Sequence, residues 1–134
     1  MFGYRDNRGS VLLLVLFVLA LSAALITGIL QITTEEILQL RNQMELARAL
    51  SVAEAGLHDA FSQIRQDVNW NDGFADKSFY DDAYTVTVSG IPPALHLVST
   101  GQTAQGYSAR IEAWIETGAT PPYSVGIQSI RINE

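Results

Sequence analysis

Hydrophobic and polar positions form three successive patterns along the chain. The first is an apolar run, RGSVLLLVLFVLALSAALITGILQITTEE, with no charge between Arg8 and Glu35. Its 21 residues from Ser10 to Leu30 would span roughly 31 Å as a helix, which matches a hydrocarbon core of about 30 Å. The run is longer than the apolar part of an ordinary signal peptide, and no clear small-residue cleavage site follows it. It therefore predicts a membrane-spanning helix.

Charges on the two sides of the apolar run predict its orientation. Arg5 and Arg8 precede the run, and Glu35 and Glu36 follow it. Basic residues remain on the cytoplasmic side of a membrane. We therefore expect a single pass with a cytoplasmic N-terminus and an extracytoplasmic C-terminus.

The second pattern is an amphipathic stem over residues 35–68. The chain from residue 31 to residue 68 has no proline and one glycine, Gly56, and consists mostly of good helix formers. From Leu46 onward, apolar residues recur every three or four positions, as on one face of a helix. We therefore expect one helix of nearly 60 residues that continues from the membrane into a soluble region.

The third pattern is alternation, which predicts four antiparallel strands over residues 83–89, 95–100, 107–116 and 124–133. The apolar positions of the last stretch change phase, which predicts a β-bulge near Gln128–Ser129. The polar stretch 69–83 is expected to be a loop. The predicted fold class is α+β: a long N-terminal helix, with a transmembrane half and an amphipathic stem, packed on a small antiparallel sheet of about four strands.

Composition narrows the possible chemistry. The chain has 134 residues, no cysteine and a net charge of −6, so disulfides and thiolate metal sites are excluded, and the acidic balance argues against nucleic-acid binding. His58 is expected on a solvated helix face, and His96 is expected to point outward because it alternates with leucines. Glu35 and Glu36 are neighbours on a helix and do not face each other. We expect no catalytic residues, no cofactor, no metal site and no enzyme activity.

Two alternatives concern the polar stretch between Asp67 and Asp82. DVNWNDG is similar to a calcium loop, but Gly73 comes one position late and Ser78 stands where a glutamate is needed. Helix termination and turn formation explain the same residues. Aromatic residues in this stretch form either an adhesive patch or packing against the domain: Trp70, Phe74, Phe79 and Tyr80.

Three features together resemble type IV pilins and type II secretion pseudopilins. They are the charged leader MFGYRDNRG ending in Gly9, the apolar helix that starts at Ser10, and the stem that leads into a β-rich region. The resemblance implies cleavage by a prepilin peptidase between Gly9 and Ser10, N-methylation of Ser10, and transfer of the subunit from the bacterial inner membrane into a filament. It covers the first 65 or so residues in detail and the remainder in architecture.

Departures from the family pattern indicate a branch. Ser10 stands where most members have an aromatic residue or methionine, and Leu14 stands where most have glutamate. The leader ending in RG, the aliphatic run without glutamate, and ARALSVAEAGLHDA at residues 47–60 are more similar to PilX-type minor pilins and K-type pseudopilins. K-type members usually carry a larger domain, which favours the pilus side. The missing glutamate implies a tip or initiating position, with an internal position as the alternative.

The expected organisation is a leader over residues 1–9, a transmembrane and fibre-core half over 10–34, a stem over 35–68, and a loop and sheet region over 69–134. The small residues of the stem can admit a second helix backbone or pack beside the sheet, and both interpretations stay open. The expected packing residues of the stem are Ala47, Leu50, Ala53, Gly56, Leu57, Ala60, Phe61 and Ile64.

The resemblance predicts a minor pilin or pseudopilin, a structural subunit for assembly or initiation of a type IV pilus or related filament. Its implied partners are other major and minor pilins or pseudopilins through helix packing, the prepilin peptidase, and inner-membrane lipid before assembly. No nucleic acid is expected. The alternative is an unprocessed, signal-anchored inner-membrane protein with a small extracytoplasmic binding module.

Overall fold

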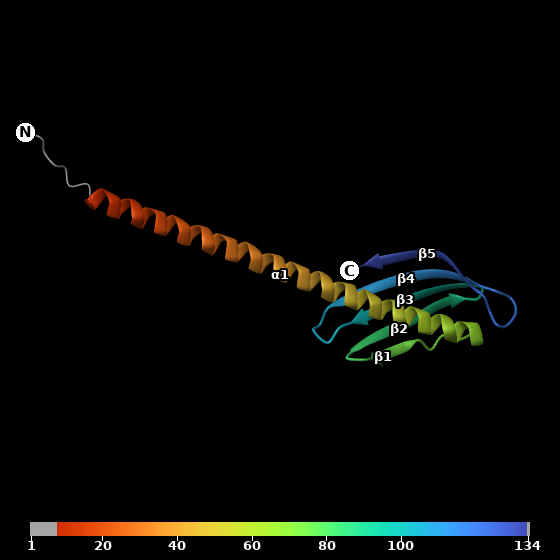
Figure 1. Cartoon of the computed structure of the whole chain (residues 1–134). Helices are drawn as coiled ribbons and strands as arrows, with labels where there is room; N and C mark the ends of the chain where they lie inside the picture. The colour runs from red at the N-terminus through yellow and green to blue at the C-terminus, as the bar shows by residue number, and fades with distance from the viewer. Residues whose placement is uncertain (1–7, 134) are drawn as a thin grey trace, which may run out of the picture. The chain divides into compact units, whose positions relative to one another are not determined.

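The computed structural model describes residues 8–133, which form one helix and one five-stranded sheet (Figure 1). Helix α1 comprises Arg8–Gln66. The strands are β1 (Phe74–Phe79), β2 (Asp82–Ile91), β3 (Ala94–Gln102), β4 (Ser108–Thr117) and β5 (Val125–Asn133). They lie in the order β1-β2-β3-β4-β5, and every neighbouring pair is antiparallel. The predicted α+β class is confirmed, with five strands rather than about four.

The chain divides into two compact units, Met1–Arg41 and Asn42–Glu134. Helix α1 contributes to both units. In the first unit, the described residues are all helical. In the second unit, the C-terminal part of α1 covers one face of the sheet (Figure 1).

The core of the second unit lies between α1 and the middle strands. Alternate residues of β2, β3 and β4 are buried, because successive side chains of a strand point to opposite faces. The α1 side chains and the strand side chains form one cluster, whose buried members are Val52, Ala53, Leu57, Ala60, Phe61, Ile64, Tyr84, Val86, Leu95, Leu97, Ile111, Ala113 and Ile115.

Strand β1 lies within the stretch 69–83, so the prediction of an uninterrupted loop there was wrong. Its sequence FADKSF does not alternate, and its burial pattern shows no regular inward face. The β1–β2 register shifts between Phe74 and Lys77, and Asp76 has a φ of 43°. Pairing with β2 therefore defines this strand, whereas its side-chain pattern does not.

The bulge predicted near Gln128–Ser129 is confirmed in β5. Trp114 is registered opposite Ser129, whereas the next β4 residue, Ile115, is opposite Ile127. Gln128 is therefore the extra residue on the bulged strand. The bulge keeps Ile127 and Ile130 on the same face of the sheet despite their odd spacing.

Candidate functional site

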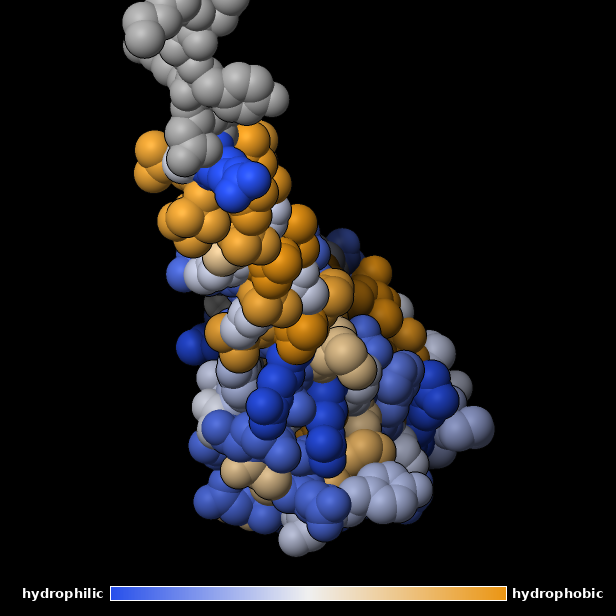
Figure 2. Space-filling model, turned by 60° about the vertical axis from the view of Figure 1, so that its left-hand side comes forward, coloured by the Kyte–Doolittle hydropathy of each residue, from blue (hydrophilic) through white to orange (hydrophobic). Residues whose placement is uncertain are grey.

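The apolar half of α1 presents an almost unbroken hydrophobic surface (Figure 2). Its large side chains are all exposed, from Val15 at 46% to Leu13 at 69%. The helix is long and apolar enough to cross a membrane. A contiguous apolar surface of this size requires lipid or protein to cover it.

Four hydroxyl side chains within the apolar half are compatible with lipid. The hydroxyl groups of Ser22, Thr27, Thr33 and Thr34 each donate a hydrogen bond to the carbonyl oxygen four residues earlier, at 2.8–2.9 Å. Each hydroxyl is therefore satisfied within the helix, as a hydrocarbon environment requires.

Apolar exposure on α1 continues beyond the acidic pair Glu35 and Glu36. Four large side chains in this continuation are more than half exposed: Ile37, Leu38, Leu40 and Met44. They lie outside the length that one bilayer can cover. They form a second apolar surface, which we call the stem strip.

The residues of the predicted cleavage site lie at the start of α1. Gly9, Ser10 and Leu14 are helical and exposed. A Cβ atom on Gly9 would meet nothing within 4 Å, so internal packing does not require a glycine there. The first seven residues of the predicted leader lie outside the described residues.

The predicted stem-packing residues divide into three groups. Leu50 is partly buried and Ala47 is exposed. The others are buried beneath the sheet: Ala53, Gly56, Leu57, Ala60, Phe61 and Ile64. The sequence therefore identified most of the face that α1 buries.

Small residues allow α1 and the sheet to approach closely. A Cβ atom on Gly56 would lie 2.7 Å from Ser99 Oγ and 2.8 Å from the Tyr84 ring. The buried Ser99 hydroxyl donates a 2.6 Å hydrogen bond to the Ala53 carbonyl oxygen. Ala53 and Gly56 of the AEAG sequence at residues 53–56 thus pack against the sheet of the same chain. The contacting residues Ser99 and Tyr84 could not be selected from the sequence, since they lie in distant strands.

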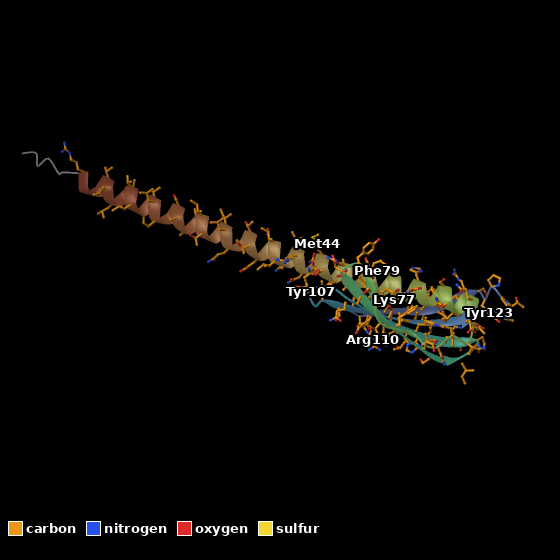
Figure 3. All side chains as sticks on the ribbon, turned by 90° about the horizontal axis from the view of Figure 1, so that it is seen from below. Met44, Lys77, Phe79, Tyr107, Arg110 and Tyr123 are labelled. Atoms are coloured by element: carbon orange, nitrogen blue, oxygen red, sulfur yellow. The ribbon has the colours of Figure 1, made fainter. Side chains whose placement is uncertain are left out.

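A charged cluster joins α1 to the edge of the sheet. Asp59 Oδ2 accepts hydrogen bonds from Lys77 Nζ on β1 and from the Tyr84 hydroxyl on β2, and Figure 3 shows Lys77 beside α1. Partial burial raises the pKa of Asp59, but the two hydrogen bonds and the positive charge of Lys77 together outweigh burial and bring the pKa below its usual value. The hydrogen bond to Asp59 raises the pKa of Lys77. The cluster therefore favours a charged Asp59 in the folded state.

Two further contacts join α1 to the sheet within the second unit. The buried carboxylate of Asp82 accepts hydrogen bonds from Arg48 Nε at 2.7 Å and from the Ala104 backbone N–H at 3.0 Å. The Tyr107 hydroxyl hydrogen-bonds with Asn42 Oδ1 at 2.6 Å. Tyr107 lies at the Met44 end of the sheet, and Tyr123 lies at the other end (Figure 3).

The two histidines occupy different environments. His58 is exposed on α1 and contacts the Phe61 ring edge-to-face. His96 is on the sheet face opposite α1, where its ring stacks on the ring of Trp114 with the two ring centroids 4.6 Å apart. Its Nε2 lies 3.7 Å from a Glu112 carboxylate oxygen. Neither histidine belongs to a group of three metal-ligating side chains within the described residues.

The aromatic residues of the stretch 69–83 are divided between packing and exposure. Trp70 and Phe74 pack against the core, with their ring centroids 5.2 Å apart. Tyr80 is 91% exposed and contacts the Phe79 ring. Phe74–Phe79 of the calcium-like stretch belong to β1.

Neither a protein-family model, nor a curated protein, nor a solved structure matches this chain. The exposed apolar surface of α1 and the close packing of α1 on the sheet remain the two features that define a candidate site. The first is a surface for association, and the second holds the helix and the sheet of the second unit together.

Proposed function

We propose that this protein is a minor pilin or pseudopilin, a structural subunit for assembly or initiation of a type IV pilus or related filament. The observation that carries this proposal is that the apolar surface of α1 extends beyond the length that lipid can cover. A helix that only anchors a domain has no need of the stem strip.

The apolar surface of α1 is longer than the hydrocarbon core of a membrane. From Ser10 to Met44 the helix contains 35 residues, or about 52 Å at 1.5 Å per residue. A hydrocarbon core covers only about 30 Å of this length. The stem strip is therefore left for protein partners, and neighbouring helices of the same kind are apolar enough to cover it.

Packing in the second unit limits where those partners can bind. Ala53, Gly56 and Ala60 are already buried against the sheet. They are not open to a second helix in the folded unit. Filament contacts in our proposal therefore lie on residues 10–44, which are all exposed in the described structure except the half-buried Gly28.

In this proposal, the apolar half of α1 lies first in the membrane and later in the filament. Before assembly, the apolar half spans the bacterial inner membrane with the N-terminus in the cytoplasm, because Arg8 precedes it and acids follow it. A prepilin peptidase cleaves between Gly9 and Ser10, and other pilins or pseudopilins then replace lipid around α1. With Leu14 in place of glutamate, no buried carboxylate needs a partner, which suits a tip or initiating position.

Processing at Gly9 tests the proposal with a matched control. Gly9 and Gly28 are both helical, and a Cβ atom on either would meet nothing within 4 Å. Gly9→Leu and Gly28→Leu therefore impose similar structural demands. We expect a methylated N-terminus at Ser10 in the unmodified chain and in Gly28→Leu, and an uncleaved chain in Gly9→Leu and in cells without a prepilin peptidase.

Mass spectrometry of the mature chain distinguishes the outcomes. An intact leader in the unmodified chain, with and without the peptidase, would contradict the proposal. That result would favour the unprocessed, membrane-anchored binding module instead.

A further inference from the structure

Strand β5 is an edge of the sheet with an apolar face. It pairs with β4 on one side, and the sheet order places no described strand on its other side. An edge strand carries backbone N–H and C=O groups that no neighbouring strand binds. Such an edge can accept an added strand if its free groups and its side chains are suitably placed.

Two backbone hydrogen bonds at the C-terminal end of β4 show toward which neighbouring strand each backbone N–H group points. The Thr117 N–H donates to the Pro93 carbonyl oxygen at 2.9 Å, toward β3. The next N–H, of Gly118, donates to the Ser124 carbonyl oxygen at 2.8 Å, on the β5 side. These directions alternate along an antiparallel strand. The backbone N–H and C=O groups of every second residue before Thr117, namely Ile115, Ala113 and Ile111, therefore also point toward β3.

This alternation identifies the free backbone groups of β5. Three β5 isoleucines are registered opposite β4 residues at two-residue steps from Thr117: Ile127 opposite Ile115, Ile130 opposite Ala113, and Ile132 opposite Ile111. These pairs are the ones without mutual hydrogen bonds. The backbone N–H and C=O groups of the three isoleucines therefore point away from β4, toward the open edge.

The same three residues carry the exposed apolar surface. Ile127, Ile130 and Ile132 are 51%, 49% and 49% exposed, whereas their β4 partners on the same sheet face are at most 2% exposed. The core face of the sheet thus continues onto β5 without a cover. An added strand would bind the free backbone groups and place its own apolar side chains beside these isoleucines.

Each edge strand has one register shift, but the opposite edge of the sheet also carries a lysine and a residue with positive φ that β5 lacks. Strand β1 has an irregular register, an exposed lysine at Lys77, and a positive φ at Asp76. Irregularity and edge lysines discourage strand addition. The only charged residue of β5 is Arg131, whose guanidinium group lies 5.7 Å from the Trp114 ring centroid on the other sheet face.

We infer that the open edge of β5 binds an extended strand of a different protein chain. That strand has apolar side chains at alternate positions on the α1 side, and an acidic side chain on the opposite side near Arg131. A second copy of β5 fits less well, because the register that aligns Ile130 with Ile132 would place two Arg131 side chains directly opposite each other. The inference goes beyond filament assembly and does not depend on it.

A defined peptide tests the inference with the full-length chain in detergent micelles. The probe is a blocked, fluorescently labelled nine-residue peptide in which valine alternates with glutamate and threonine. One control peptide has the same composition in scrambled order, and another has lysine in place of glutamate. We expect fluorescence anisotropy to show saturable binding of the alternating glutamate peptide and at least about tenfold weaker binding of both controls.

Variants of Ile130 separate strand addition from docking of a helix on the isoleucines. Ile130→Pro removes an outward N–H without removing a β4 hydrogen bond, which an edge strand tolerates. Ile130→Val keeps the N–H and most of the side chain. We expect Ile130→Pro to weaken peptide binding at least about tenfold and Ile130→Val to weaken it less than about threefold. Equal binding by both variants would overturn the inference.

Arg131→Glu provides a test that does not depend on how Ile130→Pro folds. It should reverse the preference, so that the lysine peptide binds more tightly than the glutamate peptide. An unchanged preference, or equal binding of the scrambled peptide, would overturn the inference. Sedimentation that shows a dimer of the unmodified chain, lost in both Ile130→Pro and Arg131→Glu, would assign the edge to a second copy and overturn the choice of partner.

Discussion

Gly101 of β3 lies directly against Ala49 of α1, and a Cβ atom on Gly101 would collide with the Ala49 carbonyl oxygen and the Ala53 amide nitrogen. Backbone atoms cannot move aside as a flexible side chain can. The absence of a side chain at position 101 therefore sets how closely the helix and the sheet approach.

Replacing this glycine should separate the two layers. We expect Gly101→Ala to lower the free energy of unfolding by about 3 kcal/mol, since the helix must shift to admit the methyl group. Gly126→Ala is the matched control in β5, where a Cβ atom would meet only the Glu116 carbonyl oxygen at 3.6 Å, and it should change stability by less than about 0.5 kcal/mol. Equal effects in denaturant unfolding of the full-length chain would contradict this account of the interface.

The Ser99 hydrogen bond makes a second, smaller contribution at the same interface. Ser99→Ala removes the buried donor to the Ala53 carbonyl oxygen and should lower the free energy of unfolding by about 1 kcal/mol. Ser89 lies on β2 and is exposed, so Ser89→Ala should change stability by less than about 0.5 kcal/mol. The same denaturant measurement checks both variants, and a loss as large for Ser89→Ala would show that serine removal itself is destabilising.

Asp59 should give the second unit an acid-sensitive contribution to stability. Because its pKa is lowered in the folded state, this contribution is present above the unfolded pKa of about 3.9 and is lost as the pH falls through the folded pKa. Asp59→Asn should cost about 0.5–1 kcal/mol near pH 7, a modest value because the Lys77 side chain is 46% exposed. It should also flatten the pH dependence below about pH 4.

Unfolding curves recorded between about pH 2.5 and pH 7 would test this prediction. Asp72→Asn is a suitable control, because Asp72 is exposed and forms none of the ion pairs found among the described residues. A pH dependence that Asp59→Asn leaves unchanged would assign the acid sensitivity to another carboxylate.

The stem strip should matter for association and not for folding. Ile37 and Leu40 are both 59% exposed, so the double variant Ile37→Gln, Leu40→Gln should change the free energy of unfolding by less than about 0.5 kcal/mol. The abundance of this variant in isolated filaments should fall at least about tenfold, since it lacks two apolar side chains that pack against neighbouring subunits in our proposal. The control is Gln39→Ala with Gln43→Ala, which should assemble normally; an equal loss in both would show a general effect of altering the helix.

The regular parts of the fold could be predicted from the sequence because their side chains alternate or recur with helical period. The burial pattern of β4 and the phase change around Gln128 both follow from such periodicity. The β1 strand could not be found in this way, since FADKSF does not alternate. Its place is determined by pairing with β2 and by the contact between Lys77 and Asp59.

The candidate surfaces were predictable to different degrees. The apolar half of α1 follows directly from the run without charges. The role of AEAG did not follow, because small residues suit a second helix as well as a sheet, and only the positions of Ser99 and Gly101 show that the sheet covers them. The open edge of β5 depends on strand order and hydrogen-bond direction, which alternation alone does not specify.

The most direct test asks what covers the apolar half of α1 in assembled material. A photo-reactive amino acid at Leu16, which is 55% exposed, should form crosslinks to the apolar helices of other subunits in cells that contain the prepilin peptidase. The same group at Ser89, on the exposed surface of β2, serves as the control and should not reach those helices. Crosslinks from Leu16 to lipid alone, both with and without the peptidase, would contradict the proposal that this helix passes from the membrane into a filament.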